Sequence, residues 1–171
     1  MRALVLTIGA LIVILALSSL YRWVNPTILL SPLPSNLKLL GVIDMDASHD
    51  FSIKSVAKGN DILLVLDENN FVNEFIPAHP ELSSYYSKPF DIMYYDNNHD
   101  GEIDSQEPIW GYLYIVIYSD NGATYQVRPL NDAGIHAILA RHLTPKGNHE
   151  VLLTDGDTRI LYEEFPSLSR S

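Results

Sequence analysis

The chain contains no cysteine, which excludes disulfides, thiolate metal sites, a thiol nucleophile and lipid attachment through a cysteine. Basic residues are also scarce, because 11 lysines and arginines stand against 21 aspartates and glutamates, for a formal net charge of −10. Nucleic-acid binding normally needs a basic surface, so this balance argues against a nucleic-acid partner. It favours cations or basic partners, although acidity by itself also serves solubility.

Recognisable catalytic motifs are missing as well. The chain has no G-x-S-x-G element, no phosphate-binding loop and no dinucleotide-binding glycine pattern. Its six histidines show no H-E-x-x-H spacing, and we expect His136 and His142 to be strand residues rather than zinc ligands. Carboxylates that are distant in sequence can still converge in a fold, so an enzyme is not excluded. The sequence nevertheless favours a non-enzymatic role.

Residues 3–20 form an apolar run of eighteen residues without a charge. As a helix this run would extend roughly 27 Å, which is enough to cross the hydrocarbon core of a bilayer. Residues 21–23, Tyr-Arg-Trp, suit the membrane interface. We therefore predict that residues 1–24 are a membrane anchor. The alternative is a cleaved signal peptide, because Ala16-Leu17-Ser18 has the small-x-small pattern of a cleavage site.

The same segment predicts where the rest of the chain lies. Only two residues precede the apolar run, as in an export signal. We expect a single-pass membrane protein whose body lies outside the cytoplasm, in the periplasm or at the cell surface. If the segment is cleaved, the protein is secreted.

Residues 25–36 contain three prolines and are expected to form a short, stiff spacer. From residue 37 to residue 171 we predict one mainly β domain, with antiparallel short strands and one or two short helices. Residues 112–118 are apolar on both faces, which predicts a central strand covered on both sides.

Turn residues predict three hairpins in this domain. The first covers residues 61–76 and turns at Asp67–Asn70. The second covers residues 111–127 and turns at Asn121-Gly122, and the third covers residues 149–165 and turns at Asp155-Gly156. The predicted short helices are residues 105–111, and Leu130–Ala133 after Pro129, which ends at Gly134 in the left-handed conformation.

The segment DNNHDGEIDSQE, residues 96–107, matches the calcium-loop pattern D-x-[DN]-x-[DN]-G-x5-E without a gap. Gly101 provides the sharp turn at position 6, and Ile103 is expected to point into the core. Calcium accepts six to eight oxygen ligands, whereas magnesium demands an octahedral site and transition metals prefer imidazole or sulfur. The alternative is a solvated acidic turn. The predicted Ca²⁺ ligands are Asp96, Asn98, Asp100, the backbone carbonyl of Glu102, Asp104 and Glu107.

Residues 90–139 resemble the EF-hand-type calcium modules of large secreted bacterial haemolysin-type and adhesin proteins. Those modules run through an acidic loop, a short helix, a strand, a second acidic loop and the pattern L-x-x-x-G-I-x-x-I, which residues 130–138 match here. The resemblance implies the six ligands above and an extracytoplasmic location. The chain departs from the family at residues 119–122, where the second loop is too short to surround an ion, so we expect one site.

A weaker pattern occurs at residues 44–52, DMDASHDFS, where Asp44, Asp46, Ser48 and Asp50 alternate like ligands. His49 stands where a glycine would turn the chain, and no acid closes the loop. We expect an acidic corner at the end of a strand there, with a second weak calcium site as the alternative.

The sequence is best interpreted as a membrane-tethered, extracytoplasmic calcium-binding domain with a structural or interaction role. Extracellular calcium would fill a site with an affinity of about 10⁻⁴–10⁻³ M permanently, which favours structure over signalling. The alternatives are a calcium-stabilised enzyme or enzyme accessory subunit, and a calcium-dependent sensor of a partner protein. The sequence identifies no protein partner, pathway or oligomeric state.

Overall fold

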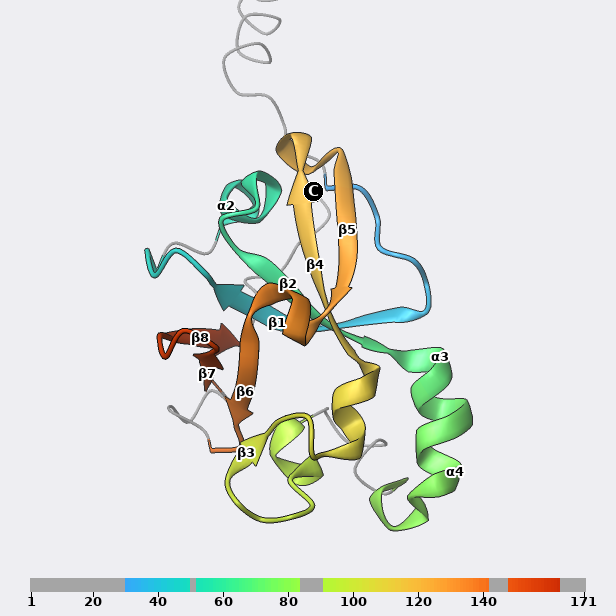
Figure 1. Ribbon diagram of the computed structural model, residues 1–171. Helices are drawn as coiled ribbons and strands as arrows, with labels where there is room; N and C mark the ends of the chain where they lie inside the picture. Colours follow the sequence, from blue (N-terminus) through green and yellow to red (C-terminus); the bar gives the residue numbers. More distant parts are fainter. Residues whose placement is uncertain (1–29, 50–51, 84–90, 142–147, 164–171) are drawn as a thin grey trace, which may run out of the picture.

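The computed structural model describes residues 30–49, 52–83, 91–141 and 148–163 (Figure 1). The predicted membrane anchor and the first part of the spacer lie outside the described residues. Within those four ranges, no helix is both long and apolar enough to cross a membrane.

The domain is built on one eight-stranded sheet with the strand order β3-β6-β7-β8-β1-β2-β4-β5. Every neighbouring pair is antiparallel, which confirms the mainly β class. Figure 1 shows the β4–β5 hairpin projecting from the sheet at the end opposite β3. The strands are β1 (Leu37–Asp44), β2 (Ile62–Asp67), β3 (Glu102–Ile103), β4 (Leu113–Ser119), β5 (Thr124–Pro129), β6 (Ile135–Leu139), β7 (His149–Leu153) and β8 (Thr158–Tyr162).

Two of the three predicted hairpins are confirmed. Strands β4 and β5 pair through η5 (Asp120–Gly122), a short helical turn in which Asn121 and Gly122 have φ of 55° and 89°. Strands β7 and β8 pair around Gly156, whose φ is 91°. These turns follow from local chemistry, because glycine and asparagine tolerate positive φ.

Strand β4 is covered on both faces, as predicted, but it is not central. Leu113 and Ile115 pack in one hydrophobic cluster, while Val116 and Tyr118 pack in another. Only β5 lies between β4 and the edge of the sheet. Helical segments cover both faces near this edge, so a run that is apolar on both sides does not require the middle of the sheet.

The first predicted hairpin is wrong, because β2 is followed by a helical run. Phe71 and Phe75, four residues apart, are both buried, and their rings stack with centroids 4.6 Å apart. The three residues between them are exposed, which is helical rather than strand periodicity. The Asp67 side chain caps the start of the run by accepting a hydrogen bond from the Asn70 amide at 3.4 Å. The run consists of α3 (Glu68–Asn70), the π-helical segment η1 (Phe71–Phe75) and α4 (Ile76–Ala78).

The other helical segments are more numerous than the one or two predicted. The predicted turn Leu130–Ala133 is η6, and Gly134 ends it with φ of 70°. The second predicted helix, residues 105–111, overlaps η4 (Pro108–Tyr112). Helix α2 (Ile53–Lys58), which was not predicted from the sequence, is capped by Ser52 and ends at Gly59 in the left-handed conformation. Two further short turns are η2 (Pro80–Leu82) and η3 (Ile92–Tyr95).

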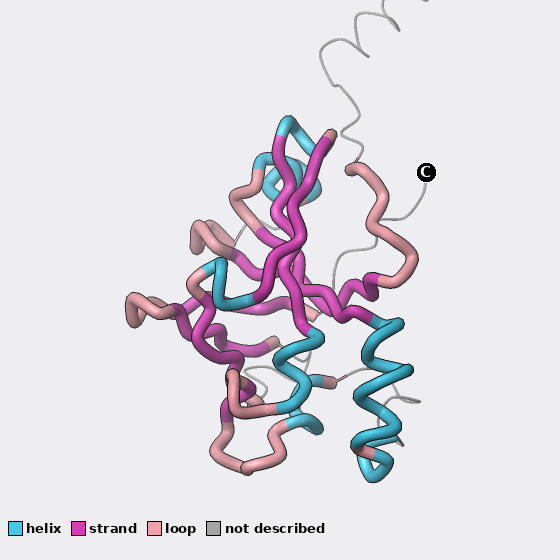
Figure 2. The backbone as a smooth tube through the Cα atoms, turned by 45° about the vertical axis from the view of Figure 1, so that its right-hand side comes forward, coloured by secondary structure: helices cyan, strands magenta, loops and turns pink. Residues whose placement is uncertain are grey.

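The larger hydrophobic cluster lies between the sheet and the helical run, and it supports the acidic loop. Figures 1 and 2 both show the helical run beside η4. The Tyr112 ring lies 5.5 Å from the ring of Phe75, and the buried Tyr95 ring lies 5.9 Å from it, in both cases edge to face. Because Tyr95 directly precedes the loop and η4 directly follows it, this cluster fixes both ends of residues 96–107.

Replacing Phe75 by alanine is expected to lower the free energy of unfolding by about 3–5 kcal/mol, because the substitution leaves a cavity beneath the helical run. Val72→Ala is the matched control, since Val72 is 40% exposed and its loss should cost less than about 0.5 kcal/mol. Urea unfolding of the full-length chain measures both. Equal midpoints for the two variants would contradict the helical assignment of residues 68–78.

Candidate metal centre

The acidic loop is attached to the end of the sheet through β3. Glu102 pairs with Leu139 and Ile103 with Ile138, and the amide of Ala140 donates to the carbonyl of Gly101 at 2.9 Å. Ile103 is fully buried in the larger cluster, which confirms its predicted direction. The second half of the loop therefore has a fixed position on β6.

Side-chain oxygens curl the first half of the loop around its centre. The Asp96 Oδ2 atom accepts from the amide of Gly101 at 3.0 Å, and the Asn98 Oδ1 atom accepts from the amide of Asp100 at 3.0 Å. The Asp100 Oδ1 atom accepts from the amide of Glu102 at 2.9 Å. Gly101 has φ of 90°, a conformation that glycine adopts at little cost.

The second half of the loop folds back through Glu107 and Asp104. The amide of Asp104 donates to Oε2 of Glu107 at 2.8 Å, while Asp104 Oδ1 accepts from the amide of Gln106 at 2.7 Å. Glu107 is 3% exposed and Asp104 is 8% exposed, so both carboxylates are buried. A carboxylate at such depth needs hydrogen bonds or a cation to compensate for lost water.

Three of the predicted ligands converge on one point. One carboxylate oxygen from each of Asp96, Asp100 and Glu107 lies within 4.8 Å of the other two. The Asp96 Oδ1 and Glu107 Oε1 atoms are buried, and neither accepts a hydrogen bond. Buried polar atoms without a partner are uncommon in native proteins. Two such oxygens, on residues whose carboxylates converge, are what an oxygen-ligated cation would require.

The other predicted ligands lie on the same loop but have different neighbours. Asn98 uses its Nδ2 group to donate to Asp100 Oδ2 at 2.9 Å. Glu102 lies in β3 opposite Leu139, and Asp104 receives its hydrogen bonds from Gln106. His99, at position 4 of the loop, is exposed and has φ of 59°. The ligand set as a whole stays a prediction.

Electrostatics also favour a cation at this centre. Burial raises the pKa of Glu107, the charges of Asp104 and Asp100 raise it further, and the hydrogen bond from the Asp104 amide lowers it. The folded state therefore keeps the Glu107 proton at pH values where the unfolded chain has lost it. As the pH rises through that window, ionisation of Glu107 destabilises the fold unless a positive charge lies nearby.

A buried ion pair lies where β7 and β8 meet the end of β6, and the sequence analysis did not identify it. His149 is fully buried, with Nδ1 2.8 Å from the Leu139 carbonyl oxygen and Nε2 3.2 Å from Oε1 of Glu163. Two acceptors require both ring nitrogens to donate, so we assign the charged imidazolium. In contrast, His136 is exposed on β6, as expected. His142 lies outside the described residues. The pairing of His149 is tertiary, and no sequence spacing signals it.

Comparison with known proteins assigns the chain to no family: no protein-family model matches it, and no curated protein matches it. The likeness to EF-hand-type modules therefore depends only on the sequence pattern of residues 90–139.

Gly101→Ala should destabilise the protein by about 1–2 kcal/mol, because alanine is strained at positive φ. No heavy atom lies within 4 Å of the added Cβ, so backbone strain is the whole effect. Gly111→Ala is the matched control: its Cβ also meets open space, and its φ is not in the positive range. Thermal unfolding compares the two, and equal melting temperatures would contradict the loop conformation.

The His149–Glu163 pair predicts a pH-dependent stability. Burial lowers the pKa of His149, but the hydrogen bonds to Glu163 and Leu139 and the charges of Glu163 and Asp91 raise it by more, so the net shift is upward. The pair therefore stabilises the fold fully below the unfolded histidine pKa of about 6.5. That contribution is lost as the pH rises through the higher folded value.

We expect His149→Gln to destabilise the protein by about 1–3 kcal/mol at acidic pH and by less at alkaline pH. Urea unfolding of the variant and the parent from about pH 5.5 to about pH 8.5 measures the difference. His136→Gln is the control and should match the parent throughout. A difference between His149→Gln and parent that stays constant with pH would contradict the assignment of a charged imidazolium.

Proposed function

We propose that residues 96–107 bind one calcium ion, and that the ion holds the β3 end of the sheet to η4. The observation that carries this proposal is the pair of buried, unpartnered oxygens, Asp96 Oδ1 and Glu107 Oε1, on two of three acids whose carboxylates converge. The domain is then a calcium-binding module with a structural or interaction role.

The ligand chemistry favours calcium over other cations. Carboxylates, an amide and a backbone carbonyl offer only oxygen, which hard cations prefer. The hydrogen bonds within the loop leave its oxygens able to bind a cation, because an oxygen that accepts from a backbone amide keeps a second lone pair. Asn98 Oδ1 and Asp104 Oδ1 can therefore hold the loop and bind an ion together. The proposed ligands are Asp96, Asn98, Asp100, the Glu102 carbonyl, Asp104 and Glu107.

The flanks of the loop support a structural role rather than a sensor. Sensor EF-hands open a pair of long helices and expose an apolar groove. Here a four-residue turn, η3, precedes the loop and a five-residue turn, η4, follows it. Ile92 and Tyr95 of η3 and Ile109 and Trp110 of η4 are buried in the larger cluster, whereas Met93 and Tyr94 are exposed. No observation on the described residues favours the two alternatives, a calcium-stabilised enzyme and a sensor.

The proposed resemblance to bacterial EF-hand-type modules includes one departure. The turn η5 occupies the place of the family's second loop, and there Oδ2 of Asp120 accepts a hydrogen bond from the Thr124 hydroxyl at 2.9 Å. Three residues that close a hairpin cannot surround an ion. The resemblance therefore supports a single calcium site within residues 90–139.

The proposed location follows from the apolar segment at residues 3–20, as an anchor or as a cleaved signal. Either would place the domain outside the cytoplasm, where calcium reaches the concentrations that fill weak sites. A permanently bound ion would then brace the domain.

Calcium is expected to raise the melting temperature and to change the fluorescence of Trp110 in a saturable way. Trp110 is 8% exposed, and its amide donates to the carbonyl of Glu107 at 3.0 Å, so it reports directly on the loop. A Trp23→Phe background leaves Trp110 as the only tryptophan. At a hundredfold excess over Kd, bound calcium should add about 2.7 kcal/mol of stability.

Asp96→Asn and Glu107→Gln should each remove most of this response, because they keep the shape of the side chain and delete its charge. Asp132→Asn is the matched control, since Asp132 is exposed on η6. Millimolar calcium that leaves fluorescence and melting temperature unchanged, or a Glu107→Gln variant that responds like the parent, would refute the calcium site. A calcium-induced increase in the binding of an apolar dye would favour the sensor instead.

A further inference from the structure

A second group of carboxylates lies at the end of the β1–β2 ladder. Strand β1 ends at Asp44, and Asp61 directly precedes β2. The ladder pairs Val42 with Leu63 and Ile43 with Ile62, so the next pair in the same register is Asp44 and Asp61. Directly opposed residues of an antiparallel pair lie on the same face, and like charges there destabilise the sheet.

Burial increases the cost of placing the carboxylates of Asp44 and Asp61 opposite each other. Asp61 is 0% exposed and Asp44 is 2% exposed. Asp46, two residues beyond Asp44, is exposed on the turn that follows. One carboxylate oxygen from each of the three acids lies within 4.8 Å of the other two.

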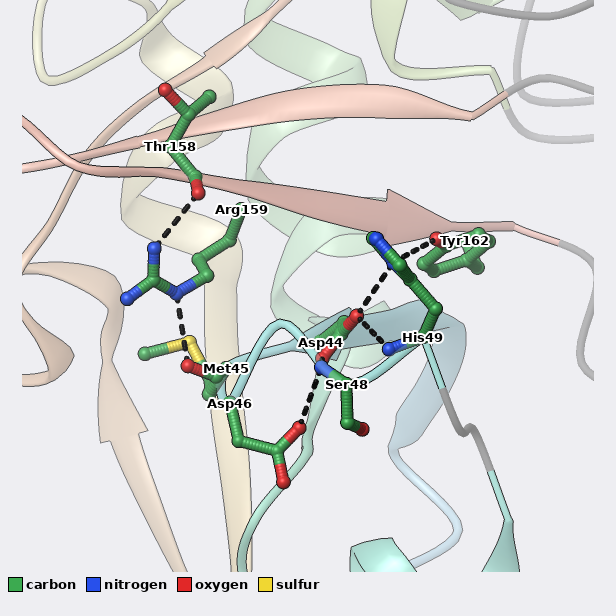
Figure 3. A network of polar contacts seen from close by, with 8 residues as sticks. All are labelled: Asp44, Met45, Asp46, Ser48, His49, Thr158, Arg159 and Tyr162. Carbon is green, nitrogen blue, oxygen red and sulfur yellow. Dashed lines mark hydrogen bonds and ion pairs between the residues drawn. The ribbon is translucent and has the colours of Figure 1, made fainter.

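Backbone amides of the turn that follows Asp44 donate hydrogen bonds to both of its carboxylate oxygens (Figure 3). Its Oδ1 atom accepts from the amide of Ser48 at 3.1 Å, and its Oδ2 atom accepts from the amide of His49 at 2.9 Å. The His49 ring also approaches Oδ2, with Nδ1 at 3.2 Å. These contacts form a tight acidic turn at residues 44–49, and Asp50 lies outside the described residues.

The carboxylate of Asp61 receives no comparable hydrogen bonds from the described residues. Both of its oxygens are buried, and neither accepts a hydrogen bond within normal geometry. Burial and the charges of Asp44 and Asp46 raise its pKa, while Ser55 and the Met45 amide lie near enough to lower it in part. A fully buried carboxylate with two unpartnered oxygens, directed at two further acids, requires a counter-ion or a proton.

The nearby arginine does not provide that counter-charge. Figure 3 shows Arg159 directed away from Asp44. Its Nε group donates to the Met45 carbonyl at 2.9 Å, and its terminal nitrogens contact the Thr158 carbonyl and the carboxylate of Asp157. A polar hollow opens at Asp46, and its lining is Asp46, Ser48, Ser52, Lys54, Ser55, Lys58 and Asn60. Neither lysine is among the charges that shift the pKa of Asp61.

We propose that Asp44, Asp46 and Asp61 bind a second hard divalent cation, which Asp61 ligates through its otherwise unpartnered oxygens. The ion would neutralise the two opposed acids of the β1–β2 ladder and hold the turn at residues 45–49 against β2. Three carboxylates leave the remaining coordination positions to water, which suits magnesium as well as calcium. No residue of the 96–107 loop takes part, so the two proposed sites can be tested independently.

The test is calorimetric titration of the full-length Glu107→Gln variant with calcium and, separately, with magnesium. This variant lacks the proposed site in the loop, so any remaining saturable binding belongs elsewhere. We expect one such site, and we expect Asp61→Asn or Asp46→Asn, added to Glu107→Gln, to weaken it by at least about 10- to 100-fold. Asp46 is exposed, so its substitution cannot abolish binding by unfolding a core. Asp155→Asn, on the exposed turn between β7 and β8, is the control and should leave binding unchanged.

The outcomes are distinguishable. If the parent and Glu107→Gln bind one ion with equal affinity and Asp61→Asn removes it, the second site is supported and the loop site is refuted. Absence of binding to Glu107→Gln overturns the second site. So does an unchanged affinity when Asp61→Asn or Asp46→Asn is added to Glu107→Gln. Infrared detection of a protonated Asp61 at neutral pH in millimolar calcium or magnesium also overturns it.

Discussion

The burial of Glu107 is the constraint on which the acidic end of the domain depends. One oxygen of its carboxylate accepts from the Asp104 amide, and the other is buried without a donor among the described residues. A carboxylate oxygen of Glu107 also lies within 4.8 Å of one from Asp96 and one from Asp100. Burial raises the pKa of Glu107, and the charges of Asp104 and Asp100 raise it further, so its ionised form is costly in the fold. A divalent cation converts the same arrangement from repulsive to attractive. In the proposed account, the loop therefore has the geometry of a calcium site.

The sheet and the helical run hold this loop in place. Pairing of β3 with β6 fixes one side of the loop, and the buried Ile103 fixes its direction. Tyr95 and Tyr112 contact Phe75 in the larger cluster, so the turns on either side of the loop cannot move apart without disturbing the core. An ion bound between such rigid flanks would stiffen the structure and would have little to switch. The surroundings of the loop therefore favour a structural role for the ion over a sensor role.

The sequence predicted well where the determinants are local, because the two confirmed hairpins depend on turn residues at Asn121-Gly122 and Asp155-Gly156. The calcium pattern also lies within twelve consecutive residues, and its ligand set stays a prediction. It failed at residues 68–78, where polar residues between apolar runs resembled a hairpin turn. There the spacing of Phe71 and Phe75, together with the cap from Asp67, outweighed that pattern. Asp61 could not have been joined to Asp44 from sequence, because only the register of β1 and β2 brings them together. The same holds for His149 and Glu163, which are paired by the fold.

The central claim is that the loop encloses calcium, and anomalous diffraction from crystals grown with calcium tests it most directly. We predict one anomalous peak inside residues 96–107, with oxygens of Asp96, Asp100 and Glu107 about 2.3–2.6 Å from it. Both oxygens of Glu107 should ligate the ion. A well-ordered loop without a peak, and with Asp96 Oδ1 and Glu107 Oε1 still unpartnered in millimolar calcium, would contradict the account.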